Sequence, residues 1–206
     1  MRRIWTIDDL PLVGNHPALD LTNTAAWPEG TPRDDHLIDY AALVRWAMRE
    51  GVINSKQATA LQTRAAARPG QAASTLHRAR AFRLALHHVF AAHASGGSVS
   101  PGILERLNRH VTIALAHGQI SKTGAKGAFT WTWNALDALD SVLWPVAQSA
   151  ADLLTSADRM ARVRLCAGED CGWLFLDSSK RGARRWCRMS ECGNRAKVRR
   201  FRERRS

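Results

Sequence analysis

The sequence has no run of about 18 apolar residues, and no apolar segment follows its basic start, Met1 to Trp5. The first absence excludes an ordinary transmembrane helix, and the second argues against a secretory signal peptide. The composition is 45% hydrophobic and 23% charged, which is typical of a globular protein. We therefore expect a cytoplasmic protein with reduced thiols and no membrane partner.

Cysteine is absent from the first 165 residues of this 206-residue chain, and four cysteines follow at Cys166, Cys171, Cys187 and Cys192. Two thiol pairs joined by a short segment are what a tetrahedral Zn²⁺ site needs, because each turn supplies two sulfurs. The alternatives are two disulfides or four unrelated core cysteines. A reducing compartment and the symmetric C-x4-C-x15-C-x4-C spacing argue against both. We expect one structural zinc ion held by these four cysteines.

Acidic residues are scarce in the same C-terminal segment. Residues 159–206 contain 15 Lys and Arg against 5 Asp and Glu, a net charge of +10, whereas the first 158 residues have a net charge of +2. Charge concentrated at one end of a chain indicates a polyanionic partner, such as DNA, RNA or an anionic membrane surface. The alternative is a solvated tail that binds nothing.

Helical periodicity dominates the first 155 residues. Apolar residues spaced by three and four, together with Gly and Pro punctuation, predict helices over 36–50, 55–68, 71–94 and 100–110. Asp34 and Asp35 are the expected caps of the first of these helices. A final helix is expected over 135–155, kinked at Pro145 or broken just before it.

A β-hairpin interrupts this helical pattern. We expect a strand over 111–120, a turn over 121–127 and a second strand over 129–133, whose three aromatic side chains share one face. The predicted fold class is therefore mainly α. A helical N-terminal domain with one β-hairpin covers residues 1–158, and a short linker near 156–160 leads to a zinc module over 159–206.

The sequence pattern of the zinc module predicts a treble-clef-like fold that ends in a basic helix. Residues 172–177 and 184–187 are strand-like around a turn, so a hairpin would bring Cys171 and Cys187 together. Helix formers without a breaker follow Cys192. On this helix Arg195, Arg199 and Arg202 would share one face, with Val198 and Phe201 packed inward. Because so small a module buries little apolar area, we expect zinc to supply most of its stability.

Particular residues of this module closely resemble a known family. They are Cys-Gly-Trp-Leu-Phe-Leu-Asp from Cys171, Arg-Arg-Trp-Cys up to Cys187, and Cys-Gly-Asn-Arg from Cys192. Together they resemble the CGNR zinc-finger family over 165–205. Ala18 to Thr24 resembles, over a shorter stretch, the helical ABATE domain that precedes this finger. The resemblance implies a bacterial transcription regulator that binds DNA through the finger and senses a ligand or stress through the N-terminal domain. Arg188 replaces the family's usual Ser, which should not affect metal binding.

Basic side chains of the module are the candidate DNA contacts. Phosphate contacts would supply affinity, and the chemistry of Arg195 and Asn194 suits guanine and adenine edges. Alternatively, Asn194 caps a turn or donates to a thiolate, and Arg195 braces Asp177. The candidate nucleic-acid-binding residues are Lys180, Arg181, Arg184, Arg185, Asn194, Arg195, Arg199 and Arg202.

Catalytic motifs are absent. The run from Ser121 to Lys126 lacks the order of a phosphate-binding loop, and no His-Glu-x-x-His occurs. The histidines at 77, 87, 88 and 93 do not align as a metal-ligand set. Since four thiolates would also fill the zinc coordination shell, we expect no enzymatic activity.

Asp20, Asn23 and Thr24 are polar residues within an apolar segment. They either line a ligand pocket or cap a helix and satisfy the hydrogen bonds of turns.

The sequence leaves two hypotheses for the function of the whole chain. The first is a DNA-binding regulator with a sensing domain, which could form a homodimer. The second is a zinc-stabilised protein that binds a small molecule and whose basic end contacts RNA, protein or nothing.

Overall fold

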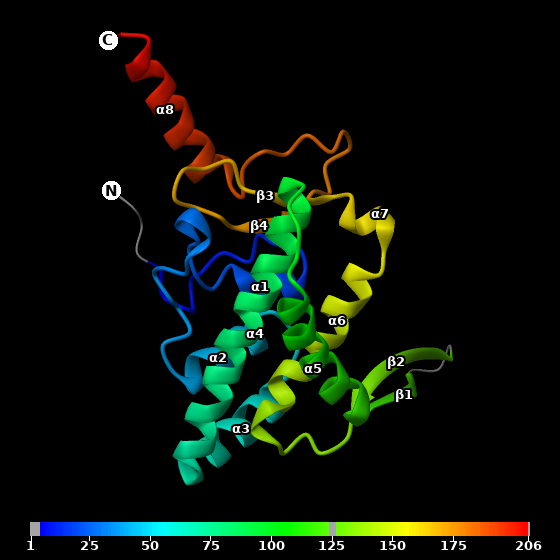
Figure 1. Cartoon of the computed structure of the whole chain (residues 1–206). Helices are drawn as coiled ribbons and strands as arrows, with labels where there is room; N and C mark the ends of the chain where they lie inside the picture. The colour runs from blue at the N-terminus through cyan, green and yellow to red at the C-terminus, as the bar shows by residue number, and fades with distance from the viewer. Residues whose placement is uncertain (1–4, 124–126, 206) are drawn as a thin grey trace.

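The computed structural model of the chain describes residues 5–123 and 127–205 and is mainly helical (Figure 1). The helices of the N-terminal part are α1 (Pro17–Thr22), α2 (Tyr40–Arg49), α3 (Ser55–Ala67), α4 (Pro69–Ser95), α5 (Pro101–His117), α6 (Trp144–Leu154) and α7 (Ala157–Met160). Short 3-10 turns η1 (Pro28–Gly30) and η2 (Leu139–Leu143) lie between them. We call the described part of residues 5–160 the helical body.

Two small antiparallel sheets complete the fold. In the helical body, β1 (Gly118–Thr123) pairs with β2 (Ala128–Trp133), so that Gly118 lies opposite Trp133. In the C-terminal part, β3 (Val163–Leu165) pairs with β4 (Leu174–Leu176). A single π-helical turn, η3 (Met189–Gly193), then leads into α8 (Asn194–Glu203). We call residues 163–205 the finger.

Side-chain hydrogen bonds cap the N-termini of α2 and α3. For α2 the capping residue differs from the prediction. The helix expected from residue 36 begins at Tyr40, because the Asp39 side chain accepts a hydrogen bond from the Ala42 N–H. The expectation that Asp34 and Asp35 cap this helix is wrong. Asp34 has a left-handed φ of 53°, and Asp35 pairs with Arg83 on α4. The α3 helix begins at Ser55 as predicted, behind a capping box of Asn54 and Gln57.

The predicted strand over 111–120 is wrong up to His117, because α5 continues without a break from Pro101 to His117. The β-branched run at Val111 to Ile113 favours a strand locally. Leu107 and Ala114 are nonetheless buried on one helical face, and this packing decides the structure. Residues 121–123, expected in a turn, belong to β1, while 124–126 of that turn lie outside the described residues.

Pro145 breaks the predicted helix over 135–155, as the sequence indicated. The segment 135–143 contains the 3-10 turn η2, and the α-helix α6 begins at Trp144 with Pro145 in its first turn. Proline lacks an N–H, and only the first turn of a helix does not need that donor. The linker expected at 156–160 contains the short helix α7.

The long helix α4 passes through the middle of the molecule and carries much of the core, including the fully buried Phe82 and Phe90 (Figure 1). The same hydrophobic core extends into the finger, where Leu174 and Phe175 are fully buried. No helix in the described ranges is long and apolar enough to cross a membrane.

A candidate metal centre and its surroundings

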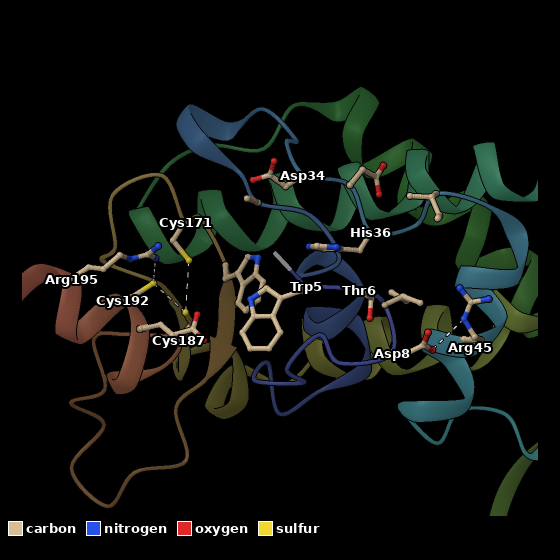
Figure 2. A pocket seen from close by; sticks show the side chains of 16 residues that line it. Trp5, Thr6, Asp8, Asp34, His36, Arg45, Cys171, Cys187, Cys192 and Arg195 are labelled. Atoms are coloured by element: carbon tan, nitrogen blue, oxygen red, sulfur yellow. Dashed lines mark hydrogen bonds and ion pairs between the residues drawn. The ribbon is translucent and has the colours of Figure 1, made fainter. Parts of the chain in front are cut away.

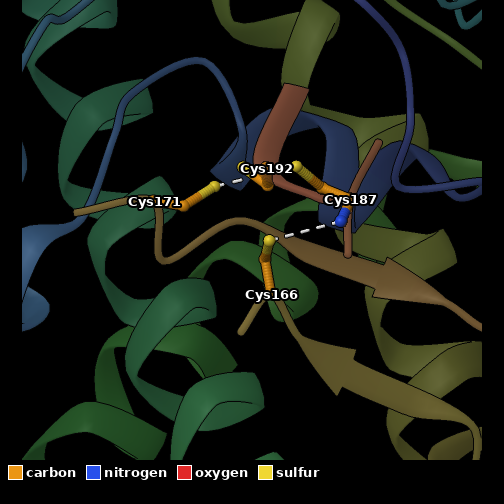
Figure 3. A group of neighbouring side chains, drawn as sticks. All are labelled: Cys166, Cys171, Cys187 and Cys192. Atoms are coloured by element: carbon orange, nitrogen blue, oxygen red, sulfur yellow. Dashed lines mark hydrogen bonds between the residues drawn. The ribbon is translucent and has the colours of Figure 1, made fainter. Parts of the chain in front are cut away.

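The four cysteine side chains converge at one point in the finger (Figure 3). Their sulfur atoms all lie within 4.8 Å of one another, and every one of these cysteines is buried and free of disulfides. The Cys171 and Cys187 sulfurs are 3.7 Å apart, and the Cys187 and Cys192 sulfurs are 3.6 Å apart. Four sulfurs at about 2.3 Å from a central Zn²⁺ would be about 3.8 Å apart. The spacing therefore fits one tetrahedral zinc ion.

Short secondary-structure elements position each thiol at the metal centre. Cys166 directly follows β3, and Cys171 lies three residues before β4, so the first pair closes the turn of this small hairpin. Cys192 lies in η3, just before the first turn of α8. Gly168 packs so close to the centre that a Cβ atom there would lie 2.9 Å from the Cys192 sulfur. The finger thus has the treble-clef-like plan, although one detail differs.

The predicted strand pairing within the finger is wrong. Residues 172–177 contribute β4, but its partner is β3 rather than 184–187. Residues 184–187 instead approach the first cysteine turn, where the Ala167 N–H donates to the Arg185 carbonyl at 2.9 Å. Cys171 and Cys187 still come together, because residues 184–187 bond to the turn between Cys166 and Cys171 and do not form a hairpin with 172–177.

Hydrogen-bond donors surround the sulfur cluster, as thiolate ligands require. The Cys187 N–H lies 3.2 Å from the Cys166 sulfur, and the Arg195 guanidinium lies 3.0 Å from the Cys192 sulfur. The neighbouring thiols, Cys166 first, and Arg195 lower the pKa of Cys192. The donor set of four buried thiols with cationic and amide support suits a Zn²⁺ ion, which Cys166, Cys171, Cys187 and Cys192 would hold with no open position.

The finger is anchored on the helical body by paired backbone and side-chain bonds. The Asn23 side chain accepts from the Leu174 N–H at 2.9 Å and donates to the Leu174 carbonyl at 2.8 Å. The Trp27 N–H donates to the Cys171 carbonyl at 3.0 Å, and the Trp173 indole donates to the Ala25 carbonyl at 2.8 Å. These bonds place the metal centre directly against the segment after α1.

A buried histidine supports the same contact. His87 of α4 donates from Nε2 to the Gly172 carbonyl at 2.9 Å and stacks on Trp27 with ring centroids 3.8 Å apart. Burial lowers the pKa of His87 to about 4, so the ring is neutral at pH 7. Gly172 has a φ of 63°, and a Cβ atom there would lie 2.5 Å from the Trp27 carbonyl oxygen. Only glycine fits at this position.

Asp20, Asn23 and Thr24 are buried, and their polar atoms are used inside the protein. The Asp20 carboxylate accepts from the Gly14 N–H at 2.8 Å, and burial raises its pKa to about 6. The Thr24 hydroxyl donates to the Leu21 carbonyl and accepts from Arg83. None of the three lines the large cavity described below. Of the two interpretations that the sequence leaves open, these contacts favour the structural one.

The eight candidate nucleic-acid contacts fall into two groups. Arg184 faces inward: its guanidinium lies 4.1 Å over the Phe175 ring and donates to the carbonyls of Val13 and Trp186. Arg195 donates to Cys192, and the Asn194 side chain donates to the Ser190 carbonyl at 3.2 Å. These contacts match the bracing alternative for the two residues, although Arg195 donates to a thiolate and not to Asp177.

The remaining candidates are exposed, as Asn194 and Arg195 also are, whereas Arg184 is half-buried. Lys180, Arg181 and Arg185 are exposed on the loop between β4 and η3, and Arg199 and Arg202 are exposed on α8. The α8 helix projects away from the rest of the molecule (Figure 1). The expected inward packing of Val198 and Phe201 is wrong, since these side chains are 50% and 58% exposed.

A cavity of about 790 Å³ adjoins the metal centre (Figure 2). Cys171, Cys187, Cys192 and Arg195 form its finger side, and Asp8 and Arg45, which are 3.2 Å apart, form the opposite end. Trp5, Thr6 and His36 lie between these two sides in Figure 2. The cavity is therefore built by the helical body and the finger together.

Sequence reasoning missed Trp27, His87 and the bracing role of Arg184. Gly172 directly after a cysteine was the available signal for a close approach, but its partner is Trp27, about 145 residues away in the chain. Only the tertiary structure brings these residues together. Within the described residues the four cysteines are the one group of three or more His, Cys, Asp or Glu side chains placed to hold a metal ion.

Comparison with known proteins agrees with this architecture. Residues 15–157 match the family model ABATE, described as "Putative stress-induced transcription regulator", and residues 162–205 match the CGNR zinc finger. A search of curated proteins finds no match. The first match covers more than half of the chain and ends just before the finger begins. The chain therefore belongs to the ABATE family and carries a CGNR zinc finger at its C-terminal side.

Proposed function

We propose that this protein is a DNA-binding transcription regulator in which the zinc centre has a structural and not a catalytic role. The observation that carries the proposal is the α8 helix, which begins at the metal centre and projects away from the body with its basic side chains exposed. A protruding basic helix has the size and charge to lie in or across a DNA groove. The family description supports the same function.

Two exposed basic segments would form the DNA-contacting surface. One is the loop with Lys180, Arg181 and Arg185, and the other is α8 with Lys197, Arg199, Arg200 and Arg202. Arg199 forms ion pairs with Glu169 and Glu203. It therefore adds less to the positive potential of this surface than an unpaired arginine would. Arg184 and Arg195 act indirectly, because their guanidinium groups hold the loop and a metal-ligand sulfur in place.

Fluorescence anisotropy with a labelled DNA duplex, repeated over a range of salt concentrations, tests this proposal. Lys197→Glu combined with Arg200→Glu should weaken binding by more than about tenfold and reduce the salt slope by about 2. The control is Arg106→Glu, which changes an exposed arginine on α5, a helix outside the finger. Zinc-loaded protein that binds no duplex, or an Arg106 variant that loses as much affinity as the α8 variant, would rule the proposal out.

Sensing of a ligand by the helical body is the second part of the proposal. It is supported by the cavity between the body and the metal centre, and not by Asp20, Asn23 and Thr24. Arg195 lines this cavity and stands in the first turn of α8. An occupant of the cavity would therefore touch the base of the proposed DNA-binding helix.

A further inference from the structure

The cavity beside the metal centre has the dimensions of a small-molecule site. Its volume of about 790 Å³ falls within the range of about 300–1,000 Å³ that ligand pockets occupy. A single zinc ion on the four cysteines would take up only a small part of this volume at one end. Residues 5–8 and 34–36 come from the body, and Trp173 and Glu191 come from the finger. The site is therefore complete only when the two parts are assembled.

Apolar and aromatic side chains form much of the lining. They are Trp5, Ile7, Ile38 and Trp173. The His36 ring lies beside Trp5 in Figure 2, and burial lowers its pKa below the ordinary value of 6.5. This ring is therefore neutral at pH 7. Indole faces stack on flat ring systems and exclude water from them, so the lining suits an aromatic occupant.

Every charged side chain that the structure describes in the lining already has a partner inside the protein. The ion pairs of the lining carboxylates are Asp8–Arg45 at 3.2 Å, Asp34–Arg33 at 3.9 Å, Asp35–Arg83 at 2.6 Å and Glu191–Arg188 at 3.3 Å. The Arg195 guanidinium donates to the Cys192 sulfur at 3.0 Å. The Thr6 hydroxyl is also engaged, because it donates to the Asp9 carboxylate at 2.8 Å. The lining therefore presents neither an unpaired acidic wall nor an unpaired basic one.

The charges around the cavity also balance. The four lining carboxylates, together with the charge of about −2 on a zinc centre with four thiolates, make six negative charges. The guanidinium groups that line the cavity or pair with these carboxylates are equally numerous: Arg33, Arg45, Arg80, Arg83, Arg188 and Arg195. A charged ligand would stay unpaired in this site or compete for an existing pair, and both cost free energy. A neutral ligand incurs neither cost.

We propose that this cavity binds a neutral small molecule with a flat aromatic body, held by Trp5, Trp173 and Ile38. Its affinity would come from stacking on the indoles and from burial of apolar surface. Such a ligand would be the signal of the sensing role proposed above, so its place in regulation rests on that proposed function. The occupant would contact Arg195 in the first turn of α8. Binding itself does not depend on DNA.

Fluorescence titration of the zinc-loaded full chain with matched probes tests the ligand class. N-phenyl-1-naphthylamine is neutral, and 8-anilinonaphthalene-1-sulfonate has the same aromatic body with one negative charge. Berberine is a flat aromatic cation. We expect saturable binding of the neutral probe with a stoichiometry of one, at least about tenfold tighter than that of either charged probe. The net charge of +12 on the chain would by itself favour the anionic probe, so surface electrostatics cannot produce this order.

Two outcomes would overturn the proposal. One is the absence of saturable binding of the neutral probe. The other is equal or tighter binding of a charged probe, which would leave a sensing cavity but exclude a neutral ligand class.

Variants locate the site. Ile38→Ala should weaken binding of the neutral probe by about threefold, and Trp5→Ala should weaken it by about fivefold or more. Ile120→Ala is the matched control for Ile38, because both isoleucines are 68% exposed and only Ile38 lines the cavity. Phe129→Ala removes an exposed aromatic ring outside the lining and should leave affinity unchanged. Zinc content and circular dichroism confirm that each variant is folded. Equal losses in the controls and the cavity variants would contradict the assignment.

No DNA is present in this titration. The DNA-binding proposal can therefore fail while the cavity still binds the neutral probe, and probe binding can fail while the α8 variants still lose DNA affinity. The two results remain separate.

Discussion

The helical body and the finger reach stability by different routes. The body supplies most of the hydrophobic core, with large buried side chains such as Trp46, Phe82 and Phe90. The finger has strands of three residues each, and its fully buried Leu174 and Phe175 belong to the body's core. Apart from these residues, the finger is organised around the sulfur cluster and a few capping bonds such as those that Asp177 accepts from the Ser179 and Arg184 N–H groups.

This difference shows that the finger is not an independent module on a linker. That zinc supplies most of the stability of the finger stays a prediction. Asn23, Trp27 and His87 of the body also bond to its first cysteine turn and β4. Metal and docking surface act on the same few residues. Loss of the metal should therefore weaken the docking of the finger, and loss of the docking contacts should weaken metal binding.

Removal of the metal should produce the largest effect. Structural zinc in small fingers contributes an apparent binding free energy on the order of 10 kcal/mol. A strong chelator, or Cys187→Ser, should abolish stoichiometric zinc binding and unfold α8, while most body helices persist. The melting temperature of the body should fall because Asn23 and Trp27 lose their partners. Metal analysis and circular dichroism measure both parts, and chelated protein with the melting curve of the zinc form would contradict the role of the centre.

Gly172→Ala should break the docking of the finger with the metal ligands unchanged. The variant combines a left-handed φ of 63° with a Cβ atom 2.5 Å from the Trp27 carbonyl oxygen, and we expect a loss of ~3 kcal/mol in unfolding free energy. Gly182→Ala is the matched control, because its φ is 61° but no atom lies within 4 Å of the added Cβ. It should cost only ~1 kcal/mol in denaturant titration. Equal costs would show that the close approach to Trp27 is unimportant.

Asn23→Ala should weaken the same contact from the side of the body. It leaves the buried N–H and carbonyl of Leu174 without partners, which costs about 2–3 kcal/mol of unfolding free energy. Asn194→Ala provides the comparison, since the exposed Asn194 donates one bond at 3.2 Å and its removal should change stability by less than about 0.5 kcal/mol. Thermal or urea unfolding distinguishes the two. An Asn23 variant as stable as the parent would show that β4 is held by packing alone.

Acidification should loosen the contact through His87, with the smallest effect. Burial lowers the pKa of His87 to about 4 in the folded protein, against an ordinary histidine value of 6.5 in the unfolded chain. The unfolded chain therefore binds more protons between these values, and stability falls as the pH drops from about 6.5 toward 4. Between pH 7 and pH 5 this contribution is ~2 kcal/mol. His87→Gln should flatten the pH dependence of unfolding free energy by that amount relative to the parent, and identical slopes would exclude His87 as the titrating group.

Much of the metal centre was predictable, because residue type and short spacing in the sequence identify the metal ligands. The C-x4-C pairs identified Cys166, Cys171, Cys187 and Cys192, and Pro145 marked a helix boundary because it lacks one hydrogen-bond donor. The strand over 111–120 failed because β-branched residues tolerate either conformation. The decision came from burial of Leu107 and Ala114.

The sequence by itself determined that a tetrahedral sulfur site exists and that basic charge lies beside it, because both depend on residue type and short spacing. Tertiary structure alone decided which basic residues remain on the surface, which side chains dock the finger and where the cavity forms. Arg184 turns inward onto Val13, and Trp27 meets Gly172, through contacts between segments that no local pattern connects. Long-range packing sets these choices, because a side chain's role depends on which distant groups surround it.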